Sequence, residues 1–567
     1  MSVRGFQPDI GLRRIPKVRT ASYTARMKTL VCVAVNVDDA GQALRDVEAA
    51  RDAGADLVEF RVDAWYERLV DEGGEPVRPV LNLIRQAELP SIVTCRPDWE
   101  GGAYIGPEQP RAELFEALLR EPGRPRYIDV ELDAFRRSPG LADQLRAARA
   151  DSSTAIIVSI HDFDSRPADL ARRLLELREL HLADVVKVAF RARSLRDNLE
   201  LFELLRERHV PTIALGMGPF GVMSRVLAPK FGGLLTFASL RDESATAPGQ
   251  PTIAELLGRY RLHSISAKTR VFGVIGWPIG HSKSPAIHNA GFEAMEFDAT
   301  YLPLPVAGHD DPEASYASFK ASVMALIEEP DLHFAGASIT LPHKGNLVRL
   351  ALEQGWQVDP FALACTAGNT LWHAGGSWRV SNTDAPAALD LLERSLGGVR
   401  GRRVLVLGAG GVARAIVLEA MRRGAVVSLW NRSPQRAERL ACELRRAAGQ
   451  IAAAERDVVL VQADSLGRAD ALINCTPAGM AGGAGAHQLP IAEDRIRGLE
   501  GLAVVQDTVY NPPQTPLLRL AASMGLVTVD GVAMFVAQAA AQFALWTGRA
   551  APKALFERIV REELGGS

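Results

Sequence analysis

The sequence predicts an α/β protein with a closed (β/α)8 barrel in its first half and a two-domain α/β second half. Three observations predict this. Apolar strand-like runs alternate with amphipathic helical stretches from residue 29 onward. A second alternating series begins near residue 270, and a glycine-rich turn between a strand and a helix follows at 408–413. Hydrophobic content of 47%, charged content of 23% and a mean hydropathy of +0.01 fit a globular protein of 567 residues.

Composition also excludes several classes of protein. The net charge of -2 leaves no basic field over the whole chain, so we expect no nucleic-acid partner. No stretch approaches the roughly 18 successive apolar residues of a membrane helix, so we expect no membrane partner. The scattered cysteines form neither a disulfide framework nor a zinc motif, and they favour a reducing compartment, the cytoplasm. The five are Cys32, Cys95, Cys365, Cys442 and Cys475.

Residues 1–28 differ from the rest of the chain. Seven of them are Lys or Arg, Asp9 is the only acid, and an apolar signal-peptide core is missing. We therefore expect a disordered N-terminal extension. A start codon placed upstream of a true start at Met27 would explain the segment equally well, and a plastid transit peptide is the alternative.

Eight strand-like runs and the helices between them predict the barrel over 29–262. The runs lie at 30–35, 56–62, 91–95, 127–132, 155–160, 185–190, 211–215 and 234–238. Helical spacing of apolar residues appears at 40–53, 111–119, 168–180, 195–208 and 253–260. Eight such units in about 235 residues favour a closed parallel barrel, with a doubly wound open sheet as the alternative.

The second half divides at its glycine motif. We predict a linker at 263–269, an α/β domain at 270–398, a Rossmann domain at 399–535 and C-terminal helices at 536–567 that return to the first of these domains. The strand-like runs lie at 271–275, 300–304, 336–340, 403–407, 425–430, 471–474 and 502–508.

Ionisable residues mark the carboxyl ends of the barrel strands, where barrel enzymes place their active sites. They are Glu59, Arg61, Arg96, Glu131, His161, Lys187 and, just past the seventh strand, Arg225. Lys187 stands among valines, and burial is expected to depress its pKa and make the amine a nucleophile toward a ketone. His161 lies one strand earlier, where it can move a proton. A structural ion pair and a core histidine are the alternatives.

The residues of this half resemble type I 3-dehydroquinate dehydratases. The matching segments are 59–61, 128–132, 159–163, 186–187, 224–225 and the loop 246–250. The resemblance implies an imine between Lys187 and the ketone of 3-dehydroquinate, with His161 moving the proton, Glu131 orienting the imidazole and Arg225 holding the carboxylate. It also implies that other residues bind the ring hydroxyls and close the site: Glu59, Arg61, Arg96, Thr246 and Gln250. It implies no metal.

The glycine motif predicts a dinucleotide site in the last third of the chain. A strand ends in a GxGxxA turn and a helix opens, the arrangement that binds pyrophosphate. The motif residues are Gly408, Ala409, Gly410, Gly411, Val412 and Ala413. The next strand ends in Asn431 and Arg432, with Arg436 beyond, and no acid stands there to accept a ribose hydroxyl. This favours NADP(H) over NAD; ordinary surface arginines are the alternative.

Segments from 270 to about 561 resemble shikimate dehydrogenases. They are 274–289, 339–344, 369–370, 381–384, 474–480, 509–512 and 531–538. The resemblance implies Lys344 and Asp384 as the catalytic pair and Ser282 and Ser284 as carboxylate ligands. It implies further substrate contacts from Thr340, Asn369, Tyr510 and Gln538, and cofactor contacts from Thr476 and Gly531. Three positions depart from the family pattern: Ser338, His343 and Ala385.

The order of the halves resembles bifunctional 3-dehydroquinate dehydratase/shikimate dehydrogenases. We therefore expect dehydration of 3-dehydroquinate to 3-dehydroshikimate and NADPH-dependent reduction to shikimate, steps of aromatic amino acid biosynthesis. The expected partners are these small molecules; the oligomeric state stays open. An NAD-dependent catabolic quinate/shikimate dehydrogenase and a non-catalytic quinate-responsive regulator are the alternatives.

Overall fold

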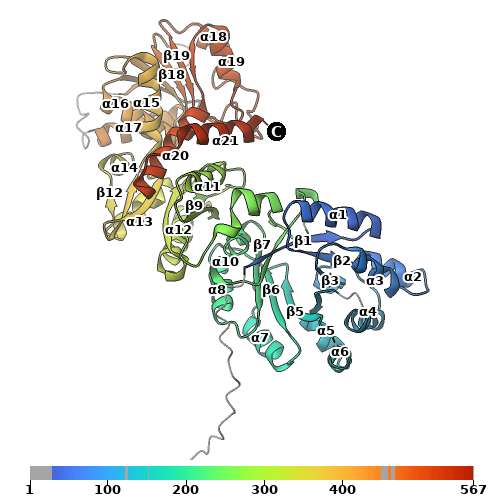
Figure 1. Cartoon of the computed structure of the whole chain (residues 1–567). Coiled ribbons are helices and arrows are strands. Elements are labelled where there is room, and N and C mark those ends of the chain that lie inside the picture. Colours follow the sequence, from blue (N-terminus) through green and yellow to red (C-terminus); the bar gives the residue numbers. More distant parts are fainter. Residues whose placement is uncertain are drawn as a thin grey trace, which may run out of the picture.

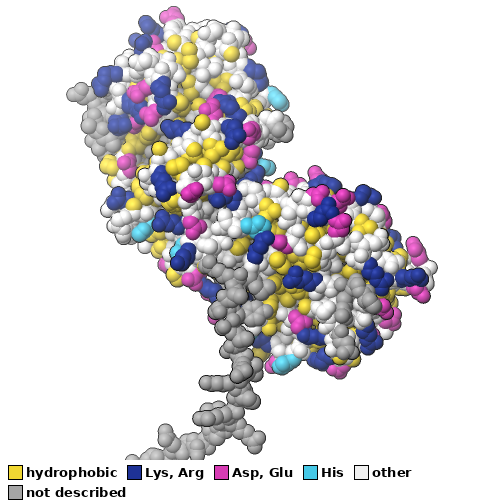
Figure 2. Space-filling model, in the orientation of Figure 1, with side chains coloured by type: hydrophobic (Ala, Val, Ile, Leu, Met, Phe, Trp, Pro, Cys, Tyr) yellow, Lys and Arg dark blue, Asp and Glu magenta, His cyan; other side chains and the backbone are white. Residues whose placement is uncertain are grey.

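The computed structural model describes residues 28–121, 125–150, 152–244, 246–448, 458–461 and 466–565. The predicted N-terminal extension therefore lies almost wholly outside the described residues. Figure 1 shows the barrel at one end of the molecule, the last α/β domain at the other and the middle domain between them. Both signs of charge are interspersed with apolar side chains on the face drawn in Figure 2. Among the described residues, no helix is both long and apolar enough to cross a membrane.

The first half is a nearly closed barrel of eight parallel strands in the order β7-β6-β5-β4-β3-β2-β1-β8. The strands are β1 (Leu30–Asn36), β2 (Leu57–Arg61), β3 (Ser91–Thr94), β4 (Tyr127–Glu131), β5 (Ala155–Asp162), β6 (Val185–Arg191), β7 (Thr212–Met217) and β8 (Leu235–Ala238). The ladder of β1 with β8 runs from Leu30↔Leu235 to Val33↔Ala238. The N–H of Leu234 donates to Thr212 O (2.9 Å) across the β7–β8 seam. The barrel prediction is confirmed, and the β1–β8 ladder excludes the open sheet.

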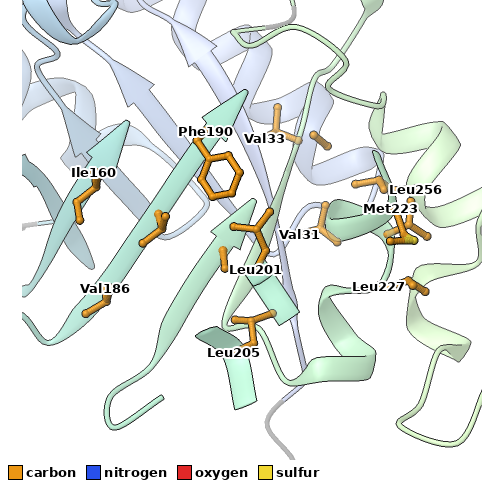
Figure 3. Close-up of a cluster of buried hydrophobic side chains, with 14 of the residues drawn as sticks. Val31, Val33, Ile160, Val186, Phe190, Leu201, Leu205, Met223, Leu227 and Leu256 are labelled. Carbon is orange, nitrogen blue, oxygen red and sulfur yellow. The ribbon is translucent and has the colours of Figure 1, made fainter. Parts of the chain in front are cut away.

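Helices cover the outside of the barrel. They are α1 (Ala40–Asp52), α2 (Asp63–Asp71), α3 (Val77–Gln86), α4 (Glu108–Arg120), α5 (Leu132–Arg137), α6 (Leu141–Arg149), α7 (Leu170–Glu179), α8 (Asp197–Arg206), α9 (Val222–Val226) and α10 (Ala228–Phe231). Figure 3 shows part of the buried apolar layer, in which Phe190 of β6 lies near Leu201 of α8. Burial of these alternating apolar faces is what holds the strand ends, and with them the site residues, in place.

The middle domain contains a mixed six-stranded sheet in the order β10-β9-β11-β13-β14-β12. Its strands are β9 (Arg270–Gly276), β10 (Ala299–Pro305), β11 (Phe334–Ile339), β12 (Gln357–Val358), β13 (Thr370–Ala374) and β14 (Ser377–Ser381). Its helices are α11 (Ser284–Ala294), α12 (Pro312–Glu328), α13 (Lys344–Glu353), α14 (Pro360–Ala364) and α15 (Asp384–Leu396). The hairpin β13–β14 turns at Gly375 and Gly376, whose φ of 60° and 78° suit glycine.

The last domain has six parallel strands in the order β17-β16-β15-β18-β19-β20, the doubly wound Rossmann order. The strands are β15 (Arg403–Leu407), β16 (Val426–Trp430), β17 (Val458–Leu460), β18 (Ala471–Asn474), β19 (Val504–Asp507) and β20 (Val527–Val529). The helices are α16 (Gly411–Arg423), α17 (Pro434–Ala448), α18 (Glu493–Arg497) and α19 (Pro516–Ser523). The Rossmann prediction is confirmed.

Two terminal helices and a short junction tie the domains together. Helix α20 (Gly531–Thr547) packs against α15 and β13, and α21 (Lys553–Gly565) packs against α11 of the middle domain. At the junction with the barrel, the Nζ of Lys230 donates to the carbonyls of Ala267 and Thr269, both at 2.8 Å. The rings of Phe220 and Trp277 stack with centroids 5.2 Å apart.

Candidate active sites

The carboxyl ends of the barrel strands surround a pocket of about 60 Å³. Eight residues predicted from the sequence line it: Glu59, Arg61, Arg96, His161, Lys187, Arg225, Thr246 and Gln250. They come from β2, β5 and β6, from the loops after β3 and β8, and from α9 after β7, so the barrel topology brings them together. The structure adds the apolar walls Phe163, Met217 and Phe237.

Lys187 lies at the bottom of this pocket, paired with two carboxylates. Its side chain is 6% exposed, and its Nζ donates to Asp129 Oδ2 at 2.7 Å and to Glu59 Oε1 at 3.3 Å. The expectation from sequence considered burial alone and did not include these two carboxylates. Burial would raise the pKa of Asp129, but Arg96 and Lys187 outweigh it and hold that pKa well below its usual range.

The imidazole of His161 is bound by a carboxylate that the sequence analysis missed. Its Nδ1 lies 2.9 Å from Oε1 of Glu100, and its own backbone N–H donates to the same oxygen at 2.9 Å. The predicted contact with Glu131 is wrong, because Glu131 is engaged by Arg96 and by Arg111 on α4. Glu100 stands in the loop after β3, a position where barrel enzymes carry site residues, and that was the available signal.

Electrostatics make His161 a neutral imidazole and therefore a base. Burial, together with the charges of Arg96 and Lys187, holds the pKa of His161 well below its usual range. Burial also holds the pKa of Glu100 above its usual range, against the attraction of Arg96. A neutral imidazole beside an amine is the arrangement that proton transfer next to a carbonyl requires.

Arg225 is a buried cation in the pocket wall. Its Nε donates to Gly216 O at 3.0 Å, and among the described residues no carboxylate lies within 4.0 Å of it. Burial lowers the pKa of Arg225 to about 10. A cation buried without a counter-charge is suited to an anionic ligand.

The loop 246–250 covers this pocket. The hydroxyl of Thr246 donates to Gln250 Oε1 at 3.1 Å, and the N–H of Gly218 donates to Pro248 O at 2.7 Å. A Cβ on Gly249, whose φ is +70°, would lie 2.5 Å from Gly218 O. The close approach of the loop to the barrel therefore requires glycine there.

A second pocket, of about 320 Å³, lies between the middle and Rossmann domains. Predicted residues that line it are Ser282, Ser284, Thr340, Lys344, Asn369, Asp384, Val412, Tyr510, Gly531 and Gln538. Lys344 and Asp384 begin α13 and α15, and the lysine Nζ donates to Asp384 Oδ2 at 2.6 Å. Both side chains are partly exposed to the pocket, at 17% and 13%. They form an acid–base pair beside an open cavity.

A hydrogen-bonded network that the sequence analysis missed forms one wall. Ser338 accepts from the Tyr301 hydroxyl at 2.7 Å and donates to Gln542 Oε1 at 2.8 Å. The Gln542 amide donates in turn to Asn369 O at 3.1 Å and to Thr370 Oγ1 at 3.2 Å. Ser338, one of the departures from the family pattern, thus links Tyr301 to Gln542. The sequence did not indicate this contact because the two residues are far apart along the chain.

The other two departures fit their surroundings. His343 is buried and stacks on Phe319 with centroids 4.9 Å apart, which preserves the packing of an aromatic residue. Its Nε2 lies 2.9 Å from Val306 O. The side chain of Ala385 is buried at the start of α15. Neither change disturbs the pair Lys344–Asp384.

The glycine turn fits the pyrophosphate of a dinucleotide. Gly410 caps α16 without a side-chain bond, and a Cβ on Gly410 or Gly411 would meet nothing within 4 Å, so there is open space beside the start of the helix, where pyrophosphate binds in such turns. Arg432 and Arg436 are exposed, and no carboxylate of the described residues lies within 4.0 Å of either. Nearby, Asn431 donates to Ser433 O (2.9 Å) and Thr476 to Asn474 Oδ1 (2.7 Å). A Cβ on Gly531 would collide with Val509 O at 2.2 Å, so only glycine fits there.

Comparison with known families agrees with both sites. Residues 31–267 match the model of the type I 3-dehydroquinases, residues 274–371 the shikimate dehydrogenase substrate binding domain, and residues 531–561 the shikimate 5'-dehydrogenase C-terminal domain. The match to the second model ends within β13, before the nucleotide-binding strands begin.

Two of the following relatives match both halves of the chain, and one matches the second half. The chain is 34% identical over 549 residues to a bifunctional 3-dehydroquinate dehydratase/shikimate dehydrogenase, chloroplastic, from Arabidopsis thaliana, which covers 94% of this chain and 84% of that protein. It is 38% identical over 304 residues to a shikimate dehydrogenase (NADP(+)) from Citrifermentans bemidjiense, covering 53% of this chain and 98% of the relative. It is 32% identical over 523 residues to a pentafunctional AROM polypeptide from Malassezia globosa, 88% of this chain and 30% of that protein. The chain therefore belongs to the family of bifunctional 3-dehydroquinate dehydratase/shikimate dehydrogenases.

Proposed function

We propose that the chain converts 3-dehydroquinate to shikimate in two steps, each at its own site. The observation that carries this is the pairing of two complete pockets. One holds a buried lysine near a neutral imidazole, and the other holds a lysine–aspartate pair beside a dinucleotide turn. The family assigns these pockets to a lyase and to an NADP(H)-dependent oxidoreductase of aromatic amino acid biosynthesis.

In the barrel, Lys187 attacks the substrate ketone after losing its proton. The amine nitrogen bonds to the carbonyl carbon, and the carbonyl oxygen takes one proton from that nitrogen and the proton that the ammonium lost, and leaves as water. The resulting iminium acidifies the neighbouring C–H. His161 takes that proton and returns it to the departing hydroxyl, which leaves as water; hydrolysis of the imine restores Lys187. Glu100 fixes the imidazole throughout.

The remaining residues of the barrel pocket bind and enclose the substrate. Arg225 binds the carboxylate, since it is a buried cation without a protein counter-charge. Glu59, Arg61 and Gln250 face the ring hydroxyls, and the loop that carries Gln250 excludes water. Arg61 is already held for this by two bonds to Asp63, at 3.1 and 2.8 Å.

In the second pocket, Lys344 and Asp384 handle the proton of the reduced carbonyl. The Lys344 ammonium donates to the ketone oxygen and delivers a proton as that oxygen becomes a hydroxyl, and Asp384 holds the lysine in position. Ser282 and Ser284 bind the carboxylate at the start of α11. The glycine turn and Arg432 hold the cofactor; bound NADPH supplies the hydride. The exposed Arg432 and Arg436 favour a 2′-phosphate over a free ribose hydroxyl, which argues against the NAD-dependent alternative.

Reductive trapping tests the first half of this proposal. Sodium borohydride added with 3-dehydroquinate should inactivate dehydration and leave a mass adduct on the peptide that carries Lys187. The dehydrogenase activity of the same sample should survive and serves as the control. An adduct on another residue, or dehydration that resists trapping, contradicts the imine mechanism.

The cytoplasm is the proposed site of action. Support comes from the five cysteines, all of which are free thiols in the structure. A fluorescent fusion to the C-terminus tests it; signal confined to a plastid would identify the N-terminal segment as a transit peptide.

A further inference from the structure

The barrel contains a buried arginine that does not line the pocket. Arg111, on α4, is 0% exposed. Its Nη2 donates to Oε2 of Glu131 at 2.5 Å, and its Nε lies 3.3 Å from Oε1 of Glu108. Burying a guanidinium is unfavourable unless nearby carboxylates balance its charge. Arg111 is therefore expected to have a role through the carboxylates that it contacts.

Arg111 ends a line of alternating charges that reaches the reactive lysine. The second oxygen of Glu131, Oε1, accepts a hydrogen bond from Arg96 Nη1 at 2.7 Å. Arg96 also lies 3.1 Å from Asp129, and Asp129 accepts from Lys187 at 2.7 Å. All five side chains are at most 6% exposed, so water cannot replace a missing member of the line.

We propose that Arg111 is a positioning residue of the dehydratase. Arg111 binds one carboxylate oxygen of Glu131, so Arg96 binds only the other oxygen of Glu131 and keeps its contact with Asp129. This inference rests on the proposed dehydratase function. Without Arg111, the Oε2 atom of Glu131 has no donor, and the carboxylate turns both oxygens to Arg96. Arg96 is then drawn away from Asp129.

Two consequences follow at the reacting groups. Asp129 loses the charge of Arg96 and binds the Lys187 amine more strongly, so the proton that must leave before attack is held more firmly. The loss of a positive charge also raises the pKa of His161, and the acid limb of the pH–rate profile moves to higher pH. The charged groups that face His161 are Glu100, Arg96, Lys187, Asp129 and Arg61.

The test compares Arg111→Met with the charge-conserving Arg111→Lys in the full chain. We expect Arg111→Met to lower the dehydration kcat about tenfold or more, because misplaced catalytic groups can cost about a hundredfold. The acid limb should move to higher pH. KM should change much less, since Arg111 does not touch the pocket. Arg111→Lys should keep the limb in place and most of kcat. NADPH-dependent reduction of 3-dehydroshikimate reports an intact second half in every sample, and the thermal transition of the barrel reports that the barrel is folded.

A double-mutant cycle with Glu131→Gln separates positioning from packing. If Arg111 acts through Glu131, Arg111→Met added to Glu131→Gln causes little further loss, and the acid limb stays at the position of the single Glu131→Gln variant. Three results would overturn the inference. The kcat losses of the two single variants could multiply in the double variant, the acid limb could stay in place in Arg111→Met, or Arg111→Lys could be as impaired as Arg111→Met. If Arg111→Met does not fold, Arg111→Gln, which also removes the charge, takes its place in the comparison with Arg111→Lys and in the cycle. A wild-type chain that borohydride does not trap contradicts the proposed function instead.

Discussion

Replacing Arg225 by Met is expected to stabilise the barrel while weakening substrate binding. The guanidinium is 2% exposed and has no carboxylate within 4.0 Å among the described residues. Burial lowers its pKa to about 10. The charged form therefore lies about 3 kcal/mol above its level in water at neutral pH. Because the lowered value is still far above 7, the native protein carries this cost at physiological pH, and it would disappear only above pH 10.

The net change is smaller than that cost. Met removes the Nε–H bond to Gly216 O at 3.0 Å, a loss of about 1 kcal/mol, and it packs less tightly than the arginine stem. We expect a net gain of about 1–2 kcal/mol. For a domain of this size, that raises the barrel Tm by about 2–8 °C. Binding should fall by about ten- to a hundredfold, since a charge-assisted hydrogen bond contributes about 1.5–3 kcal/mol.

Scanning calorimetry and dehydratase kinetics measure the two effects on one sample. The melting transition of the barrel is identified as the one whose Tm changes when the wild-type protein is trapped with 3-dehydroquinate and borohydride. Arg191→Met, an exposed arginine at the end of β6, is the matched control and should change Tm by no more than about 1–2 °C. A lower Tm in Arg225→Met with an unchanged KM would refute the reasoning, because it would mean that Arg225 supports the fold and not the substrate.

Three further outcomes follow from the same contacts. Arg432→Ala should raise the KM for NADPH about ten- to a hundredfold and leave the KM for NADH nearly unchanged, whereas Arg439→Ala should change neither; equal weakening of both cofactors would make Arg432 structural. His161→Ala should abolish dehydration and leave reduction of added 3-dehydroshikimate within about twofold, since distant sites act independently; loss of both activities would mean a shared site. Burial raises the pKa of Asp507 to about 6, so the native state binds more protons than the unfolded chain between about pH 4 and 6, and stability falls as pH rises through that window. Asp507→Asn should accordingly be more destabilising at pH 4.5 than at pH 6.5 by about 1–2 kcal/mol in urea unfolding, and an equal cost at both values would contradict the shift.

The barrel and the Rossmann domain could be predicted because their strands are buried on both sides. A buried parallel strand is a continuous apolar run, which a sequence displays directly. Strands β17 and β20 were missed because each has three residues and lies at a sheet edge. The hairpin β13–β14 was missed although its Gly375-Gly376 turn lies between strand-like residues, a recognisable signal.

The site residues could be predicted where the order of the barrel strands places them. The contacts among them could be predicted much less well, because these depend on which charged side chains pair. His161 lies near the end of β5, and Lys187 lies on the neighbouring strand β6, opposite Ser159, so topology alone brings them together. Asp129 was missed although it is two residues from Glu131 in β4, a spacing that turns both acids to the same face. The partner of His161 could not be chosen from the sequence, because Glu100 and Glu131 both follow barrel strands and only the positions of Arg96 and Arg111 decide between them.

The central claim is that one chain carries two complete and consecutive activities. The most direct test is to mix the purified full-length protein with 3-dehydroquinate and NADPH and to follow both NADPH absorbance and products. We predict one NADPH oxidised for each shikimate formed, with no NADPH consumed when 3-dehydroquinate is omitted. Lys344→Ala should instead stop at 3-dehydroshikimate. Formation of no shikimate, or shikimate formed by a chain that carries both His161→Ala and Lys344→Ala, would contradict the account.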